Sequence, residues 1–457
     1  MQDSASARPF DTPPDSPQAR HQPLPENNRT LTILGSTPED KLARSTYFKT
    51  IFGGSLLIVL AIYLVFSIYW GSLWDTPAHI HKIHGWVVDF DGGEIGQAVV
   101  SALQQAQSQN QITWVVKDQA QFPDGPSGLA YAVHDQKCWA AIAINPGASG
   151  NLSAALAAVN ASYNGSLAIT AYGNEGRNEN SFRSIIRPQI EGILRGVSSN
   201  LARQVSQDLA SSNLLPEILA SSPQTLLQPV SFIFDNIHPF DVPVAMASTF
   251  VGLIYLVILS FMCTMISFGA RMGSGYEFKL SISSLVRLRV ATPFFMYFFI
   301  SLFYSLLNLA FQVPFNRAFG ASGFVIYWML QWCGMLALGL ALEAMLTLLT
   351  ERFTPFFMVL WIIANVSVAA LPVELLPGVF KYAYATPFFN LNEGSRAIIF
   401  GTKNELGLNF GVLIAWIVLS LLTMPLFIWI KRRKLGKKNI EDAPRHVPVD
   451  EHEKLAA

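Results

Sequence analysis

The sequence predicts an α-helical integral membrane protein with six transmembrane helices and an extracellular α/β domain inserted between the first and second helices. Three observations predict this class. The 457 residues are 51% hydrophobic and only 14% charged, whereas soluble domains are usually about 25% charged. Clusters of lysine and arginine alternate with long apolar segments. A more polar stretch of roughly 170 residues, the size of a typical domain, separates the first apolar segment from the second.

The predicted membrane segments follow from length, because a bilayer core needs about 20 apolar residues per helix. They are residues 51–70, 244–268, 291–311, 324–350, 355–371 and 411–430. We therefore divide the chain into five parts. These are a disordered cytoplasmic tail (1–45), transmembrane helix 1 (46–70), an extracellular α/β domain (71–243), a five-helix transmembrane bundle (244–430) and a basic, then acidic, cytoplasmic tail (431–457).

Basic residues near the membrane segments predict the orientation, because cytoplasmic loops are enriched in lysine and arginine. Three basic clusters stand out: Lys41, Arg44 and Lys49; Arg271, Lys279, Arg287 and Arg289; and KRRKLGKK from Lys431. With six helices, all three fall on one side of the membrane. Both termini are then cytoplasmic, and residues 71–243 lie outside. Three sequons inside that domain, at Asn151, Asn160 and Asn164, are glycosylation candidates that agree with this orientation.

The outer domain alternates between strand-like and helix-like segments, which predicts an α/β or α+β layer fold. Strands are expected at 86–90, 112–116, 138–144 and 166–171, and helices at 95–107, 128–134, 152–159 and 180–209. The last helix carries one apolar stripe, and Pro188 is expected to kink or break it. Two arrangements of this helix fit the stripe: a stalk above the membrane, or a helix packed on the sheet.

The stretch GWVVDFDGGEIGQAVVSAL, from Gly85, reads as strand, glycine turn and helix, the opening of many nucleotide-binding domains. Its glycines do not match the dinucleotide fingerprint G-x-G-x-x-G, and the chain contains no G-x-x-x-x-G-K-[ST] motif. We therefore expect no nucleotide cofactor and no ATPase activity of its own. Asp89 and Asp91 form a D-x-D sequence that has two interpretations, a metal site or a turn with a helix cap. We favour the turn.

Other candidates for chemistry are few. His79, His81 and His84 are spaced so that imidazoles can meet on zinc, but no fourth ligand is evident, and we expect no metal. The sequence has no Ser/His/Asp order and no G-x-S-x-G elbow. Its cysteines, Cys138, Cys263 and Cys333, form neither a disulfide framework nor a zinc motif. We predict that the protein is not an enzyme and needs no cofactor.

Polar residues inside the predicted bundle are candidates for a transport path. Glu343 is an acid within an otherwise apolar helix, and such groups are functional candidates by default. The alternative is that Glu343 reaches the cytoplasmic headgroups or pairs with Arg352. Asn308, Gln331 and Asn365 lie in other predicted helices or helix faces, where they either line the same path or hydrogen-bond one helix to another.

Three stretches resemble known membrane proteins. VVDFDGGEIGQAVVSAL, from Val87, and CWAAIAINPGASGNLSAAL, from Cys138, resemble the first two units of the outer domain in membrane subunits of ABC-2-type exporters. ATPFFNLNEGSRAIIFGT, from Ala385, followed by LGLNFGVL, is similar to the fungal nitrosoguanidine-resistance membrane protein family. The resemblance covers about residues 48–433. It marks as family-motif residues Asp89, Asp91, Pro387, Asn390, Glu393 and Arg396.

This resemblance implies a plasma-membrane protein linked to drug resistance and lipid organisation. The predicted function is a permease-like protein that exports, or confers resistance to, xenobiotic or amphipathic compounds, or that moves lipids. The alternative is a non-transporting scaffold or sensor that organises lipids and signals through its cytoplasmic tails. Expected partners are membrane lipids, an amphipathic small-molecule substrate, and a second copy of the chain or another membrane protein. Nucleic acid is not expected.

Overall fold

The computed structural model describes residues 31–211 and 214–441. The chain separates into two compact units, Met1–Ala61 and Ile62–Ala457. Helix α1 (Pro38–Ala61) belongs to the first unit. It begins inside the segment 1–45 that we expected to be disordered, because Thr37 and Asp40 cap it: the Asp40 amide donates to Thr37 Oγ1 at 3.1 Å. Residues 1–30 and 442–457 of the two expected tails lie outside the described residues.

Five helices of the described chain are long and apolar enough to cross a membrane, where the sequence predicted six. They are Pro38–Leu73, Pro243–Gly273, Ile282–Ala310, Asn316–Val366 and Leu406–Arg433. The first contains α1, a π-helical turn (Ile62–Phe66) and α2 (Ser67–Leu73). The others contain α10 (Gly252–Gly273), α12 (Ile282–Ala310), α14 (Gly323–Val366) and α16 (Leu406–Glu441). The short helices α11 (Tyr276–Lys279) and α13 (Asn316–Phe319) precede α12 and α14.

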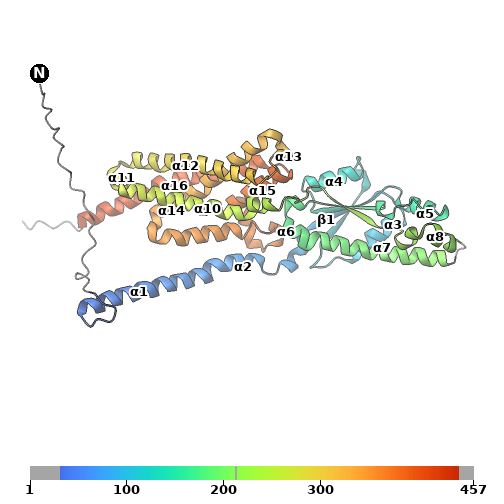
Figure 1. Cartoon of the computed structure of the whole chain (residues 1–457), viewed down its shortest axis with the longest axis horizontal. Helices are drawn as coiled ribbons and strands as arrows, with labels where there is room; N and C mark the ends of the chain where they lie inside the picture. Colours follow the sequence, from blue (N-terminus) through green and yellow to red (C-terminus); the bar gives the residue numbers. More distant parts are fainter. Residues whose placement is uncertain (1–30, 212–213, 442–457) are drawn as a thin grey trace, which may run out of the picture. The chain divides into compact units, whose positions relative to one another are not determined.

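Helix α14 joins the fourth and fifth predicted segments and folds back at Thr350. That residue has φ 69° and ψ 168°, outside the helical region. Gln331 in the first arm donates to Ser395 Oγ at 3.3 Å, and Asn365 in the second arm accepts from the Phe388 amide at 3.2 Å. Both partners lie in α15 (Pro387–Phe400), which at 14 residues is about 21 Å long. A straight helix would place residues 331 and 365 about 51 Å apart, so the turn at Thr350 is what brings both arms to α15 (Figure 1).

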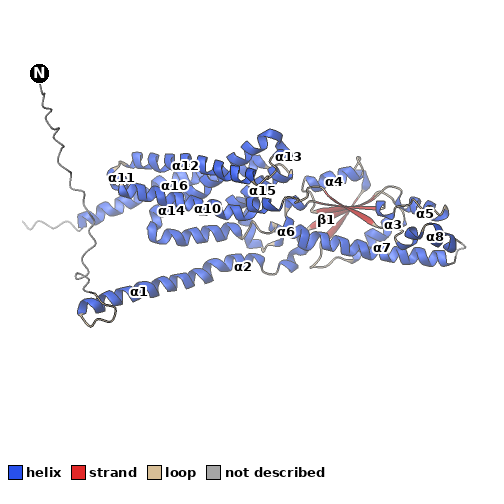
Figure 2. Ribbon diagram, viewed as in Figure 1, coloured by secondary structure: helices blue, strands red, loops and turns tan. Residues whose placement is uncertain are grey.

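The outer domain is built on a five-stranded sheet in the order β2-β1-β3-β4-β5. Its strands are β1 (His84–Asp89), β2 (Thr113–Lys117), β3 (Ala140–Ile144), β4 (Ile169–Gly173) and β5 (Phe232–Asn236). Strand β1 pairs in parallel with both β2 and β3, β3 pairs antiparallel with β4, and β4 pairs in parallel with β5. Figure 2 shows this sheet as the strand-containing part of a mainly helical chain.

Side chains alternate between the two faces of the sheet, as the period of a strand requires. Val87, Ile142 and Ala171 face a core shared with α3 (Glu94–Gln105), α5 (Ala148–Ala157) and α7 (Arg187–Ala210). Val88 and Ala143 face the other side, which α4 (Pro126–His134) covers. The four strands and the short helices expected from the sequence are thus present, with end positions shifted by a few residues. The strand β5 and the helices α8 (Leu215–Ser221) and α9 (Pro223–Leu227) were not expected.

The long helix predicted at 180–209 packs on the sheet and is not a free stalk. Its apolar stripe, including Ile190, Leu194 and Val197, is buried in the domain core. It forms as a helical turn α6 (Glu179–Ser181), a π-helical turn (Phe182–Ile186) and α7. Pro188 is the second residue of α7, which follows directly after the π-helical turn, and the helical backbone continues through it, because Ile186 before α7 also has helical dihedral angles (φ −66°, ψ −58°). Pro188 therefore does not break the helix.

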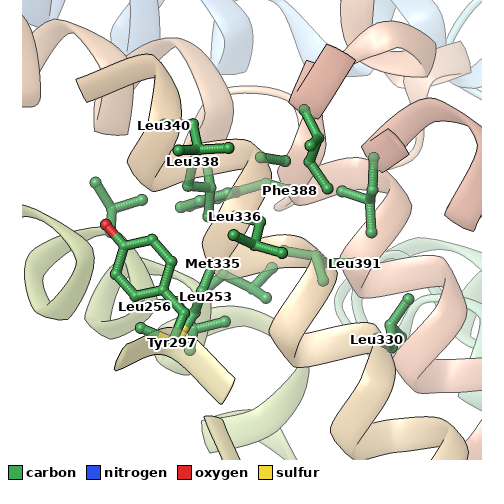
Figure 3. Packing of buried hydrophobic residues seen from close by; sticks show 14 of the residues in the cluster. Leu253, Leu256, Tyr297, Leu330, Met335, Leu336, Leu338, Leu340, Phe388 and Leu391 are labelled. Atoms are coloured by element: carbon green, nitrogen blue, oxygen red, sulfur yellow. The ribbon is translucent and has the colours of Figure 1, made fainter. Parts of the chain in front are cut away.

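The membrane bundle has its own apolar core, centred on the first arm of α14. Figure 3 shows Met335, Leu336, Leu338 and Leu340 of this arm among residues from α10, α12 and α15. Tyr297 of α12 packs at the same place and is fully buried. Helix α15 therefore packs against the bundle on one side, and its other side contacts the outer domain.

Candidate functional site

Helix α15 carries the motif residues expected near the C-terminus, and it connects the bundle to the outer domain. Pro387 stands in the first turn of α15, where its fixed φ suits the start of a helix. Asn390 and Arg396 are buried, each with about 1% of its surface exposed. Glu393 lies between them on the same helix, and three- and four-residue spacing places these side chains along one face.

Arg396 forms an ion pair with the outer domain. Its Nη2 lies 2.6 Å from Glu179 Oε2, and both side chains are 2% exposed. The same guanidinium donates to the Gly176 carbonyl at 2.9 Å and to Asn392 Oδ1 at 2.7 Å. A buried arginine requires such a set of acceptors, because an unpaired charge in the interior is costly. The motif arginine thus fixes α15 to the segment that follows β4.

Asn390 orders the start of α15 and reaches α16. Its Nδ2 donates to the carbonyls of Tyr384 at 3.0 Å and Thr386 at 2.8 Å. Its Oδ1 is therefore turned the other way, and it accepts from Asn409 Nδ2 at 3.2 Å. Asn409 is 2% exposed, and its Oδ1 accepts no hydrogen bond from the described residues. This leaves one buried acceptor without a partner.

A polar cavity of about 150 Å³ has Asn409 in its lining. Segments of the outer domain, η12 (Gly378–Ala385), α15 and α16 all contribute to its wall. The polar and aromatic lining includes Trp139, Arg177, Glu374, Tyr384, Asn390, Asn392, Glu393, Glu405 and Asn409. The lining also contains Leu408, 63% exposed, in the first turn of the membrane-spanning part of α16. The cavity therefore lies where the outer domain meets the end of a candidate membrane span.

Arg177 provides a positive charge in the cavity wall. Its guanidinium carbon lies 3.4 Å from the centre of the Trp139 ring, which holds the group by a cation–π contact. Its Nη1 donates to the Cys138 carbonyl at 3.4 Å, and its Nη2 lies 3.8 Å from Glu374 Oε1. Both contacts are longer than a strong charge-assisted hydrogen bond, which is about 2.7–2.9 Å. Arg177 thus retains N–H groups for an anionic ligand.

Glu393 provides a negative charge in the same wall. Burial raises the pKa of Glu393 above its ordinary value, although the nearby Arg396 and Arg177 act to lower it. Glu405 and Glu374 add to the upward shift by repulsion. Glu405 also forms an ion pair with Lys403 at 2.8 Å. The cavity consequently combines a stacked guanidinium, carboxylates and amide acceptors within one small volume.

The acid predicted for the transport path, Glu343, lies in a second buried cluster of charges. Its Oε1 is 2.6 Å from Arg271 Nη2 and 3.5 Å from Arg289 Nε. Glu277 pairs with the same two arginines, at 3.1 Å from Arg271 Nε and 2.6 Å from Arg289 Nη2. The expectation that Glu343 pairs with Arg352 is therefore wrong. Sequence reasoning missed these partners because they lie at the end of α10 and near the start of α12.

The cluster contains two arginines and two glutamates, so its charges balance, and neighbouring residues add further hydrogen bonds. Arg289 also donates to Thr347 Oγ1, and Arg432 donates to the Glu277 carbonyl at 3.2 Å. Burial acts to raise the pKa of Glu277, but Arg289 and Arg271 outweigh it, so the pKa lies below its ordinary value. Two of the basic residues that set the predicted orientation, Arg271 and Arg289, are thus buried and paired instead of facing headgroups.

The three amides predicted beside Glu343 each bind a neighbouring element. Asn308 accepts from Ser248 Oγ at 2.6 Å and donates to the Tyr304 carbonyl at 2.9 Å. Gln331 donates to Ser395, and Asn365 accepts from the Phe388 amide. The structure therefore does not bring Glu343, Asn308, Gln331 and Asn365 to one place. Each of the three amides makes the helix-linking contact that was its alternative interpretation.

Asp89 and Asp91 shape the turn that opens the outer domain. Asp89 Oδ1 accepts from the amides of Asp91 at 3.0 Å and Gly92 at 2.9 Å. Asp91 accepts from the Ser149 amide at 3.1 Å and from the Ser149 hydroxyl, and that hydroxyl in turn accepts from the Ile95 amide at 3.1 Å. The two aspartates thus join the N-terminal ends of α3 and α5. Asp91 caps α5, which is not the helix that follows it directly in sequence.

The remaining sequence candidates lie apart from the cavity. His79 and His81 are in a 3₁₀ segment (Thr76–Lys82) and His84 starts β1. Among the described residues, no group of three His, Cys, Asp or Glu side chains is arranged to hold a metal. Asn151, Asn160 and Asn164 are all exposed on the outer domain, as glycosylation requires.

The cavity residues Arg177 and Asn409, and Glu179, the partner of Arg396, were not singled out from the sequence. The sequence contains a polar pattern that could have drawn attention to these residues. Arg177 and Glu179 belong to NEGRNEN, a dense polar run directly before a long helix, and Asn409 is the polar residue of LGLNFGVL. The run after β4 holds Glu175, Asn178 and Glu179 buried, which is unusual for side chains of this kind.

A comparison with known families matches the outer domain and the membrane bundle together. The profile of a family described as proteins of unknown function, DUF3533, matches residues 55–422. The chain belongs to this family. The match covers the first candidate membrane span from residue 55 onward, the outer domain and most of the bundle, including the cavity. The family description names neither nitrosoguanidine resistance nor ABC-2 exporters.

A relative in Saccharomyces cerevisiae extends the comparison. It is described as an uncharacterised endoplasmic reticulum membrane protein, and it is 26% identical over 431 residues. The match covers 86% of this chain and 82% of the relative. No solved structure matches the chain. The description of the relative as a membrane protein agrees with the five candidate membrane spans in the described part of this chain.

Proposed function

We propose that this protein is a permease-like membrane protein that binds amphipathic molecules at the boundary between its outer domain and its membrane bundle, and moves or excludes them. The observation that carries the proposal is the polar cavity beside α15. It combines Arg177, Glu393 and aromatic side chains directly beside Leu408 at the end of a candidate span. A molecule with a polar head and an apolar tail has matching surfaces on both sides of that boundary.

The proposal includes a topology. Counting the two arms of α14 separately raises the five candidate spans to six. This is physically reasonable because the 51-residue span Asn316–Val366 would be about 76 Å long if straight, whereas a bilayer core is about 30 Å thick. Six passes place both termini in the cytoplasm and the outer domain outside the cell or in a lumen. We propose the plasma membrane as the location, because of the resemblance to the nitrosoguanidine-resistance family. The alternative location is the endoplasmic reticulum, which the description of the yeast relative suggests.

A partner protein or a gradient supplies the energy for transport in this proposal, since the sequence contains no P-loop motif. A non-transporting scaffold or sensor is the second candidate function. It is favoured by one observation, the pairing of Glu343 and the three amides with neighbouring helices inside the bundle. A bundle whose polar groups are satisfied internally needs no water-filled path.

The two functions differ in a reconstituted transport assay. The purified full-length protein is placed in vesicles, and the movement of a fluorescent lipid and of an amphipathic cation is measured with and without ATP. A permease-like protein is expected to move at least one probe above empty vesicles, and Arg177→Gln is expected to reduce that movement. The matched control is Arg195→Gln, since Arg195 is an exposed arginine on α7. Absence of movement for every probe, with the protein folded, would support the scaffold.

A further inference from the structure

The wall of the cavity beside α15 contains an amide pair whose orientation is fixed by its neighbours. Asn390 Nδ2 donates to two backbone carbonyls, so Asn390 Oδ1 must face Asn409, which presents its Nδ2 to that oxygen. The usual ambiguity of an amide side chain is therefore removed by the network. Both amides are almost fully buried, so the charged side chains of the lining are the groups that can meet a ligand.

The charge of the cavity wall favours a cationic group. Glu393 and Glu374 line the cavity together with Arg177, and the other arginine near Glu393, Arg396, is already paired with the outer domain. Glu405 is compensated by Lys403, so the two other carboxylates outnumber the arginine of the lining. A primary ammonium group carries one positive charge and three N–H donors that can bind carboxylate oxygens, whereas a trimethylammonium group has no N–H to offer.

Arg177 and the rim define the rest of the ligand. The guanidinium is held on the Trp139 ring and makes only long polar contacts, so it can bind an anionic oxygen group such as a phosphate. The cavity of about 150 Å³ is smaller than the roughly 300–1,000 Å³ of sites for drug-sized ligands, so it suits a head group more than a whole molecule. Leu408 and Tyr384, 63% and 56% exposed, line the same cavity at its apolar side.

We propose that this cavity binds the head group of a lipid in which a primary ammonium is linked to a phosphate, with Glu393 receiving the ammonium and Arg177 the phosphate. This inference rests on the proposed function for its membrane setting, and it specifies the class of molecule bound there. Soluble phosphoethanolamine has the same chemistry without the tails. The exposed Leu408 favours the lipid, because acyl chains can lie against it.

The test measures binding of defined lipids to the purified full-length protein in detergent. Short-chain phosphatidylethanolamine, the matching phosphatidylcholine and soluble phosphoethanolamine are titrated by calorimetry. We expect phosphatidylethanolamine to bind at least tenfold more tightly than either other compound. Glu393→Gln and Arg177→Gln are each expected to weaken that binding at least tenfold. The control Glu217→Gln alters an exposed glutamate on α8 and is expected to have no effect.

Each alternative result has a distinct meaning. Equal binding of phosphatidylcholine would overturn the requirement for N–H donors. Binding that is unchanged in both cavity variants, when their unfolding temperatures match the parent, would overturn the site. Equal affinity for phosphoethanolamine would replace the lipid by a soluble ligand. Selective binding without movement of any probe in vesicles would leave this inference standing and refute the permease, whereas transport without selective binding would refute this inference alone.

Discussion

Glu343 shows how the meaning of one residue depends on partners that are distant in sequence. An isolated acid in an apolar helix is a candidate for a transport path. The structure places it within hydrogen-bonding distance of Arg271, 72 residues earlier, in a cluster that Glu277 and Arg289 complete. The composition of the helix predicts that Glu343 needs a partner, but it does not say which one. That information is in the packing of α10 and α12 against α14.

Replacing Glu343 tests whether the cluster holds the bundle together. Glu343→Gln leaves two buried arginines facing Glu277 alone, and removing one partner of a buried ion pair typically costs about 3–5 kcal/mol. We expect the purified variant to unfold at a clearly lower temperature, measured by intrinsic fluorescence in detergent. The exposed Glu217→Gln should stay within about 0.5 kcal/mol of the parent. Unchanged stability together with loss of transport would return Glu343 to the transport path.

Among the helices and strands, those of the outer domain were predicted best from the sequence. Alternation of apolar residues over five or six positions predicts strands, and three- and four-residue spacing predicts helices, because each element buries one face. Strand β5 was missed since its burial pattern shows no fully buried residue. The stripe of α7 was identified, but the same stripe fits a stalk and a packed helix equally well. Only the sheet beside it decides between them.

The turn after β1 gives a prediction about a single glycine. A methyl group on Gly96 would collide with the carboxylate of Asp89, which is held by the amides of Asp91 and Gly92. Gly96→Ala should therefore destabilise the outer domain by about 1–3 kcal/mol, as overpacking usually does. Gly150→Ala is the control: it lies in α5 with open space around it, and alanine is about 0.5–1 kcal/mol better than glycine inside a helix.

Thermal unfolding of the full-length protein, followed by tryptophan fluorescence, measures both glycine variants. The expected order of stability is Gly150→Ala at or above the parent, and Gly96→Ala below it. If Gly96→Ala is as stable as the parent, the carboxylate of Asp89 is free to move, and the turn is less fixed than its hydrogen bonds indicate.

For the whole molecule, hydropathy located the membrane segments and separated residues 324–350 from residues 355–371. In the structure these two segments are the two arms of α14, which has non-helical dihedral angles at Thr350. The sequence did not predict that both arms contact α15. Likewise, the motif stretch from Ala385 was recognisable, but its role as a connector depends on Glu179, which belongs to another domain.

Topology is tested by protection and glycosylation in a eukaryotic host. With both termini cytoplasmic, epitope tags at either end should survive protease added to intact cells or sealed microsomes. At least one of Asn151, Asn160 and Asn164 should carry a glycan, since all three are exposed on the outer domain. Endoglycosidase treatment then shifts the band, and the triple Asn→Gln variant does not shift. Cleavage of a tag on the intact membrane would contradict the six-pass topology.

The contact between Arg396 and the outer domain also limits how early during synthesis the outer domain can acquire its full set of contacts. The Gly176 carbonyl and the Arg396 guanidinium that binds it are 220 residues apart. A ribosome adding roughly 5–20 residues per second needs about 11–44 s to cover that distance. For all of that time Glu179 has no arginine to neutralise it, and the newly made domain displays a carboxylate destined for the interior. The nascent protein therefore passes through a prolonged immature stage, which ends only when α15 has been synthesised and has packed against the outer domain.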